Sequence, residues 1–190
     1  MNSHPANISI VQQDIVEMNV DAIVNAANEG LRAGSGVCGA IFAAAGRSQL
    51  QAACDQIGHC PTGSAVITPG FDLPAAHVIH AVGPIWRGGG NNEETLLASC
   101  YTTALDLAME HRLRSIAFPL ISSGIFGYPK QEAWRVALGA CRAKLAAHPD
   151  YVLEVRFCVL SEDALEMGQR ILEETATQAA DGRAGSSPAC

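Results

Sequence analysis

The stretch from Asp21 to Gly46 constrains the fold most, because it joins a buried strand, a glycine-rich loop and the start of a helix. Residues 20–26 are apolar enough for a strand that is covered on both faces. Gly34, Gly36 and Gly39 follow in the loop, where glycine permits positive φ and close approach of the backbone to a ligand. The loop therefore predicts an anion-binding cradle beside a helix N-terminus, with a tight turn without a ligand as the alternative.

The same three glycines match the G-x-G-x-x-G fingerprint of dinucleotide-binding oxidoreductases. That fingerprint needs its first glycine directly after the first strand of a βαβ unit, and an acidic residue about twenty positions further on. Here a polar run, residues 28–32, separates strand from glycines, and an earlier strand is expected at residues 8–11. The nearest later acid, Asp55, comes early and falls in a predicted helix. The pattern therefore disfavours a dinucleotide site.

Composition indicates one globular domain. The 190 residues are 48% hydrophobic and 16% charged, which suits a single core over residues 1–177. Residues 178–190 are rich in Gly, Ser, Ala and Pro and predict a disordered tail. The net charge of −7 argues against anionic membranes and nucleic acid as partners. An RNA-binding protein stays as a third class, disfavoured because an aromatic content of 5% leaves few stacking platforms.

The cysteines and histidines do not form a metal-binding pattern. The seven cysteines contain no CxxC pair and are odd in number, which argues against a disulfide framework and a zinc knuckle. His77 and His80 lie three apart on a predicted strand and face opposite sides of it. We therefore expect no metal and no cofactor. The N-terminus lacks the features of a signal peptide and no apolar stretch reaches bilayer length, so a cytoplasmic protein is expected.

Strand-like and helix-like segments alternate along the chain. The predicted strands are 8–13, 20–26, 64–68, 77–82, 115–120 and 153–160, and the predicted helices are 40–57, 92–111, 130–147 and 162–175. This order predicts an α/β sandwich with a mostly parallel sheet. The turn at 69–74 is too short for a helical crossover, so the strands beside it should be antiparallel. A second glycine-containing loop, 122–129, also follows a strand, and two such loops at one sheet edge could hold a diphosphate.

Five ordered blocks of sequence resemble the macrodomain, specifically its MacroD-type branch. They are residues 24–28 (VNAAN), 34–41 (GSGVCGAI), 61–65 (PTGSA), 78–86 (VIHAVGPIW) and 117–129 (AFPLISSGIFGYP). The likeness runs from about Ile8 to Glu173. It implies a three-layer α/β/α sandwich with a mixed, mostly parallel central sheet. It also implies binding of ADP-ribose, with hydrolysis of O-acetyl-ADP-ribose or release of ADP-ribose from mono-ADP-ribosylated proteins modified on acidic side chains.

The resemblance also implies roles for individual residues. Asp14 would accept from the adenine amino group, the Ile15 amide would donate to the ring, and Leu160 would pack on it. Phe126 would lie against the distal ribose, and Asn28 would bond that ribose. The implied ligand-binding residues are Asp14, Ile15, Asn25, Gly34, Gly36, Val37, Ser122, Ser123, Gly124, Ile125, Phe126 and Leu160.

Each of these assignments has a plainer structural alternative. Asp14 could cap a turn, because Asp side chains commonly bond the backbone two residues on. Asn25 and Asn28 could be turn formers for the same reason. Phe126 could belong to the core, which is the usual place for an aromatic side chain.

Two positions depart from active MacroD-type members, which usually carry aspartate where this chain has Cys38 and often histidine where it has Phe42. General-base assistance is worth about a hundred- to ten-thousand-fold in rate. We favour slow hydrolysis with Asn28 and Cys38 at the catalytic position, since alphavirus macrodomains resemble this chain in carrying Gly-Val-Cys there. A reader without chemistry is the alternative. Cys38 as a covalent nucleophile would need a base that the sequence does not place.

Overall fold

A computed structural model describes residues 7–184, which form one six-stranded sheet covered by helices. The strands are β1 (Ile8–Gln12), β2 (Ala22–Ala26), β3 (Ala65–Pro69), β4 (His77–Ala81), β5 (Ser115–Phe118) and β6 (Glu154–Val159). The helices are the 3-10 turn η1 (Ile15–Glu17), α1 (Gly36–Ala45), α2 (Arg47–Ile57), α3 (Glu93–Glu110), α4 (Lys130–Ala147) and α5 (Glu162–Ala184).

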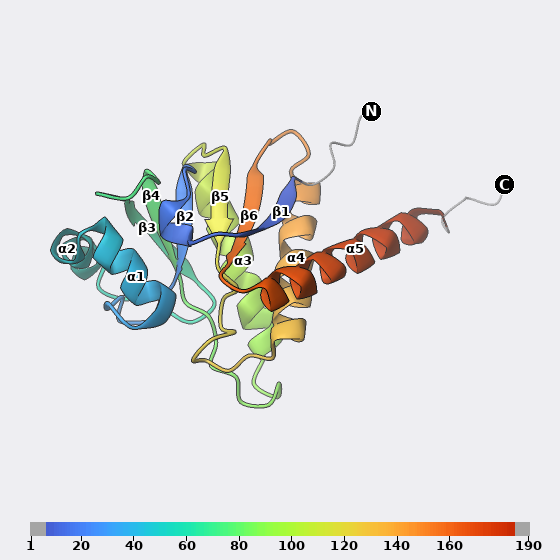
Figure 1. Cartoon of the computed structure of the whole chain (residues 1–190), viewed down its shortest axis with the longest axis horizontal. Helices are drawn as coiled ribbons and strands as arrows, with labels where there is room; N and C mark the ends of the chain where they lie inside the picture. Colours follow the sequence, from blue (N-terminus) through green and yellow to red (C-terminus); the bar gives the residue numbers. More distant parts are fainter. Residues whose placement is uncertain (1–6, 185–190) are drawn as a thin grey trace.

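The sheet is mixed and mostly parallel, as the alternation of elements predicts. Its strand order is β1-β6-β5-β2-β4-β3, and Figure 1 shows these strands side by side. Every neighbouring pair is parallel except β3 with β4, the pair that flanks the short turn at residues 69–74. The expectation of one antiparallel pair is therefore confirmed. A short turn can reverse the chain, whereas a parallel return needs a crossover of a dozen or more residues.

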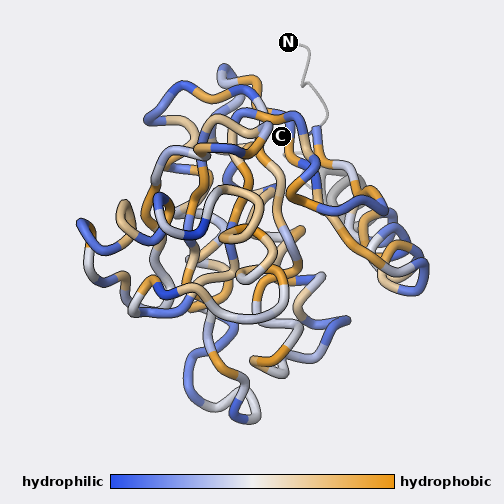
Figure 2. Tube along the Cα trace, turned by 60° about the vertical axis from the view of Figure 1, so that its left-hand side comes forward, coloured by the Kyte–Doolittle hydropathy of each residue, from blue (hydrophilic) through white to orange (hydrophobic). Residues whose placement is uncertain are grey.

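Strand alternation divides the interior into two cores and gives three layers. In β2, Ala22 and Val24 pack toward α3, α4 and α5, whereas Ile23 packs toward α1, α2 and η1. Successive side chains of a strand point to opposite faces, so one apolar strand serves both layers. Figure 2 shows many hydrophobic stretches of the trace in the interior of the molecule and hydrophilic stretches mainly in the outer loops. The three-layer α/β/α sandwich is confirmed.

The core under α3 fixes the chain where it leaves β5. Tyr101 on α3 is fully buried, and its ring packs 5.2 Å from that of Phe118. Its hydroxyl accepts a hydrogen bond from the Ile121 N–H at 3.0 Å. A buried N–H that lost this acceptor would cost about 1–3 kcal/mol. The aromatic core therefore sets the starting point of the loop at residues 122–129.

Three helix boundaries differ from those predicted. The region 40–57 is two helices, because Gly46 takes a φ of 90° between α1 and α2, and α1 begins at Gly36. At the C-terminus α5 continues to Ala184, beyond the predicted end at residue 175 and into the segment predicted as a tail. Alanines at 179, 180 and 184 favour helix. The rest of the predicted tail lies outside the described residues. Across residues 7–184, no helix has both the length and the apolar character needed to cross a bilayer.

Candidate functional site

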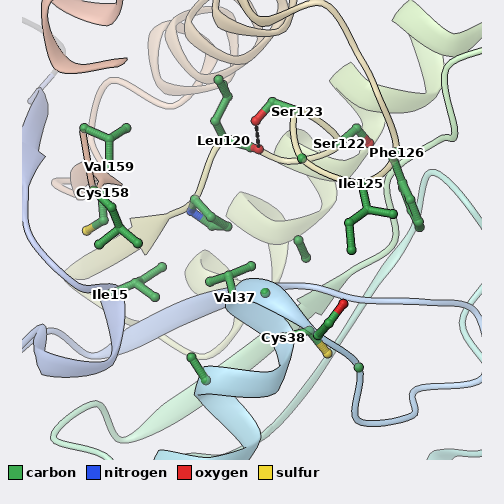
Figure 3. A pocket seen from close by; sticks show the side chains of 18 of the residues that line it. Ile15, Val37, Cys38, Leu120, Ser122, Ser123, Ile125, Phe126, Cys158 and Val159 are labelled. Atoms are coloured by element: carbon green, nitrogen blue, oxygen red, sulfur yellow. Dashed lines mark hydrogen bonds between the residues drawn. The ribbon is translucent and has the colours of Figure 1, made fainter. Parts of the chain in front are cut away.

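A cavity of about 680 Å³ lies where four parallel strands end. Its walls come from the segments that follow β1, β2, β5 and β6, together with the start of α1. Figure 3 shows Ile15, Cys158 and Val159 at one end, and Ser122, Ile125 and Phe126 at the other. The carboxyl ends of the strands are where open α/β sheets bind ligands. The two glycine-containing loops thus border a single hollow, as the sequence predicts.

The first loop presents the N-terminus of α1 to the cavity. Gly34, Gly36, Val37 and Cys38 all line it. Gly36 has a φ of 59°, as expected for a cradle, but Gly39 serves a different purpose. A Cβ at Gly39 would lie 2.5 Å from the Gly34 carbonyl oxygen, so only glycine permits this packing. The first N–H groups of a helix have no partner within the helix, and here they adjoin the hollow.

The second loop is a tight, internally bonded turn. The Tyr128 N–H donates to the Ser122 carbonyl at 2.9 Å, and the Ser123 hydroxyl donates to the Leu120 carbonyl at 2.8 Å (Figure 3). Ser122 has a φ of 65°, and its hydroxyl is buried without a partner among the described residues. Within residues 7–184, the N–H groups of 124, 125 and 126 donate no hydrogen bond. Both loops therefore bring unpaired backbone donors to one cavity.

At one end of the cavity Asp14 has a structural role. Its Oδ1 accepts the Val16 N–H at 3.1 Å and caps the short helix η1. Asp14 therefore caps a turn, which is the structural alternative to a ligand-binding role. Asp14 and Ile15 also line the cavity, so both roles are compatible. Leu160 also lines it and is 76% exposed, so a flat ring could pack against its side chain. Burial raises the pKa of the neighbouring Cys158 thiol to about 12, so this thiol stays neutral.

At the other end, Asn28 and Cys38 lie beside the backbone of Arg32. The Asn28 side chain donates to the Arg32 carbonyl at 2.8 Å and accepts from the Arg32 N–H at 3.0 Å. The Cys38 Sγ lies 3.7 Å from the same carbonyl oxygen. Asn has further donor and acceptor capacity, so it can still bond a hydroxyl in the cavity. The described residues that line the cavity include no histidine, which leaves Cys38 without that base.

Asn25 does not line the cavity, although the resemblance places it in the ligand-binding set. It is 1% exposed, and its Nδ2 lies 3.1 Å from His80 Nδ1. Thr68 Oγ1 lies 2.9 Å from the other ring nitrogen, and burial lowers the pKa of His80 to about 4, so the ring is neutral. Strand alternation places Asn25 on the face of Ile23, under α1 and α2. We therefore leave Asn25 out of the proposed contacts.

Several lining residues were not predicted from the sequence. They are Gln13, Ala26, Ala27, Ser35, Ala40, Pro119, Leu120, Lys130, Cys158, Val159 and Ala164. Lys130 matters most, because it is the only cationic side chain among the described lining residues. Its position directly after the second glycine-containing loop is a signal that could have found it. The apolar residues could not be assigned, because an apolar strand end is equally consistent with core.

The second loop is braced by residues 83–92. The Trp86 N–H donates to the Phe126 carbonyl at 2.8 Å. Glu93 is 2% exposed and accepts the N–H groups of Arg87 at 3.0 Å and Asn91 at 2.6 Å. Burial by itself raises the pKa of this carboxyl, but the backbone donors outweigh burial and lower it to about 2. Glu93 is therefore an internal anion around which the bracing loop folds.

Replacing Glu93 by Gln is expected to lower the melting temperature by several degrees at neutral pH, because an amide cannot accept from donors on both of its atoms. The folded pKa of about 2 lies below the ordinary 4.5, so this stabilisation is complete above about pH 4.5 and is lost as pH falls toward 2. Thermal unfolding of both proteins between pH 7 and pH 2 tests this expectation. A melting-temperature difference that stayed constant across that range would contradict it, and Glu110→Gln serves as the charge-matched control.

Comparison with known proteins agrees with this geometry. The Macro domain model matches residues 24–137. A macro domain-containing protein of Chlorobaculum tepidum is 49% identical over 170 residues, covering 88% of this chain and 98% of that protein. The ADP-ribose glycohydrolase MACROD1 of Rattus norvegicus is 51% identical over 156 residues, covering 82% of this chain and 60% of that protein.

Solved structures agree as well. A mutant of the Oceanobacillus iheyensis macrodomain with ADPR superposes with a TM-score of 0.81 at 40% identity, covering 88% of this chain and 92% of that one. A Trypanosoma brucei macrodomain in complex with ADP-ribose gives a TM-score of 0.79 at 36% identity, covering 86% and 68%. The matching family model spans both cavity loops, and sequence and fold likeness extend over most of the chain. The chain therefore belongs to the macro domain family.

Proposed function

We propose that the cavity binds ADP-ribose and that the protein hydrolyses ADP-ribosyl esters, namely mono-ADP-ribosylated acidic side chains and O-acetyl-ADP-ribose. One observation carries the proposal: two loops with unpaired backbone N–H groups line the same cavity at the ends of parallel strands. Such donors suit a diphosphate. A relative that is an ADP-ribose glycohydrolase and a solved macrodomain in complex with ADP-ribose support the same ligand.

The cavity has a distinct part for each portion of ADP-ribose. Adenine fits between Asp14, Ile15 and Leu160, and the diphosphate fits between the two loops. The distal ribose then reaches Asn28 and Phe126. Because the chain carries a net charge of −7, the anion must be held by local groups. Backbone donors, the α1 N-terminus and Lys130 supply that local positive potential.

Ester hydrolysis adds water across the ester bond and releases ADP-ribose and a carboxylic acid. Asn28 can orient the distal ribose or the attacking water, but an amide does not take up the proton of that water at neutral pH. Cys38 lines the same end of the cavity. Active MacroD-type macrodomains usually carry an aspartate at this position. We therefore expect slow hydrolysis, driven by positioning between the loops.

A module that binds ADP-ribose without chemistry is the second candidate. It is favoured by a specific observation: the described cavity lining contains Asp14 as its only carboxylate, at the end away from Asn28, and no histidine. General acid–base catalysis most often uses such groups. The two candidates share the ligand and differ only in turnover.

Two measurements test these functions in order. Calorimetric titration with ADP-ribose, ADP and NAD tests the ligand, and tighter binding of ADP-ribose than of ADP is expected because the distal ribose meets Asn28 and Phe126. No heat with ADP-ribose would overturn the proposal. Single-turnover reactions on a peptide modified on glutamate and on O-acetyl-ADP-ribose then test chemistry. If the protein binds ADP-ribose but forms no product above the buffer rate, the second candidate, a module that binds ADP-ribose without chemistry, is supported.

A further inference from the structure

A second, smaller hollow of about 210 Å³ lies outside the ADP-ribose cavity. Trp86 and Tyr128 form an aromatic wall, with ring centroids 4.6 Å apart and planes inclined by 56°. Glu94 from the first turn of α3 and Glu132 from the first turn of α4 add carboxylates, and Arg135 completes the rim. We call this hollow the acidic–aromatic crevice.

Tyr128 supplies the crevice with a hydroxyl that has no partner in the described part of the protein. The residue is only 3% exposed and lines the crevice, yet its hydroxyl makes no hydrogen bond within residues 7–184. Burial raises the pKa of this hydroxyl, and the charges of Glu94, Glu93 and Glu132 raise it further. The phenol thus stays protonated close to carboxylates. The hydroxyl is not among the buried unpaired polar atoms of the described residues, so it reaches the open side of the crevice. There it can bond water or an external polar group.

The charge of the crevice favours a cation. Glu94 and Glu132 form no ion pair with any described residue, whereas Arg135 is paired with Glu174 at 3.2 Å. Acidic residues in a first helical turn also favour the helix dipole, which alone would explain two exposed glutamates. That role does not require them to converge on a concave aromatic wall. A guanidinium group matches both features, since it stacks on aromatic faces and bonds carboxylates in a planar fork.

The crevice and the ADP-ribose cavity share a wall. Phe126 lines the cavity and Tyr128 lines the crevice, so their Cα atoms are at most about 7 Å apart along the chain. The Trp86 N–H bonds the Phe126 carbonyl across this wall. Ile125, which lines the cavity, is 83% exposed, and Ile85, the chain neighbour of Trp86, is 51% exposed. We call these two exposed apolar side chains the rim. A polypeptide whose modified side chain enters the cavity would cross this rim.

We propose that the acidic–aromatic crevice binds an arginine side chain of the ADP-ribosylated polypeptide, a few residues from the modified position. This inference rests on the proposed function, because it assigns substrate selection to a surface beside the same cavity. Trp86 stacks on the guanidinium, Glu94 and Glu132 accept its N–H groups, and the Tyr128 hydroxyl provides a further acceptor. Substrates that lack a nearby cation are held by the ADP-ribose group alone.

The test uses peptides that carry ADP-ribose through a non-hydrolysable linkage, with arginine two to four residues from the modified position or with neutral citrulline in its place. The arginine peptide is expected to bind about fivefold more tightly, the upper range for partly exposed ion pairs, here with Glu94 and Glu132. In the Glu94→Gln/Glu132→Gln double variant this preference should disappear while the Kd for free ADP-ribose stays unchanged. Glu132→Lys alone should also remove it, by repulsion. Glu110→Gln, at the opposite end of α3, should retain the full preference.

The outcomes separate the two proposals. Equal binding of the arginine and citrulline peptides, with ADP-ribose affinity intact, would overturn the crevice assignment and leave the proposed function standing. The same holds for a preference that survives both crevice variants or that Glu110→Gln also abolishes, since either result means non-specific attraction. Absence of ADP-ribose binding by the unmodified protein would instead overturn the proposed function. If a peptide with lysine in place of the arginine bound as tightly as the arginine peptide, the preference for a guanidinium group would be overturned.

Discussion

Replacing Cys38 by aspartate is expected to raise the single-turnover rate of ester hydrolysis by about a hundredfold or more, the lower range for an added general base. Cys38 is 6% exposed and lines the cavity end that also holds Asn28. A carboxylate there could take the proton of a water that Asn28 helps to orient. The gain should come with weaker ADP-ribose binding, because the new charge would lie near the diphosphate and near the Arg32 carbonyl, 3.7 Å from the present Sγ.

The matched control is Cys38→Asn, which has the shape of the aspartate variant without its charge. It should leave the rate near that of the unmodified protein, so that any gain is assigned to the carboxylate. Comparing single-turnover rates at saturating enzyme separates chemistry from the loss of affinity. A rate that falls in both variants would contradict the expectation and identify the thiol as a participant. Equal rates in all three proteins at the buffer level would support the non-catalytic reader.

Replacing Gly83 by alanine is expected to weaken ADP-ribose binding by tenfold or more. A Cβ at this position would lie 2.2 Å from the Ser122 hydroxyl oxygen and 2.5 Å from Ile121 Cγ2. Overpacking of this kind costs about 1–3 kcal/mol of folding stability. A tenfold loss of affinity needs about 1.4 kcal/mol of that strain to displace the second loop. Ser122 already has a φ of 65°, and relief of the contact must move it. The unpaired N–H groups of residues 124–126 would then lose their alignment with the diphosphate.

Calorimetric titration of Gly83→Ala with ADP-ribose checks this expectation. Gly90→Ala is the matched control, because it lies in the same bracing loop and a Cβ there would meet no atom within 4 Å. The control should bind ADP-ribose like the unmodified protein. If the Gly83→Ala variant had a lower melting temperature but the same affinity for ADP-ribose, the bracing loop would have shifted to relieve the new contact. In that case the second loop would not depend on Gly83 for its alignment.

Local patterns were sufficient for much of this protein. Short apolar or alternating runs bounded by turn residues placed every strand to within a few positions, and the short turn at 69–74 required the antiparallel pair. Glycines after buried strands predicted both cavity loops. These features depend on backbone freedom and on side-chain periods of 2 and 3.6, which neighbouring residues express without help from the rest of the chain. The helix α5 ends later than predicted, because the composition after residue 177 gave no helical pattern to follow.

Tertiary structure alone decided which distant residues meet. Asn25 sits in a motif shared with Asn28, yet the pairing of β2 with β4 joins it to His80 and away from the cavity. In the sequence Glu93 is an ordinary acidic residue in the first turn of a helix. In the structure the loop before α3 folds around its carboxylate. The acidic–aromatic crevice needs Trp86 and Tyr128, over forty positions apart, in contact. Neighbouring residues determine local secondary-structure preference. Contacts between residues far apart in the sequence depend instead on strand order and on which helices cover each face of the sheet.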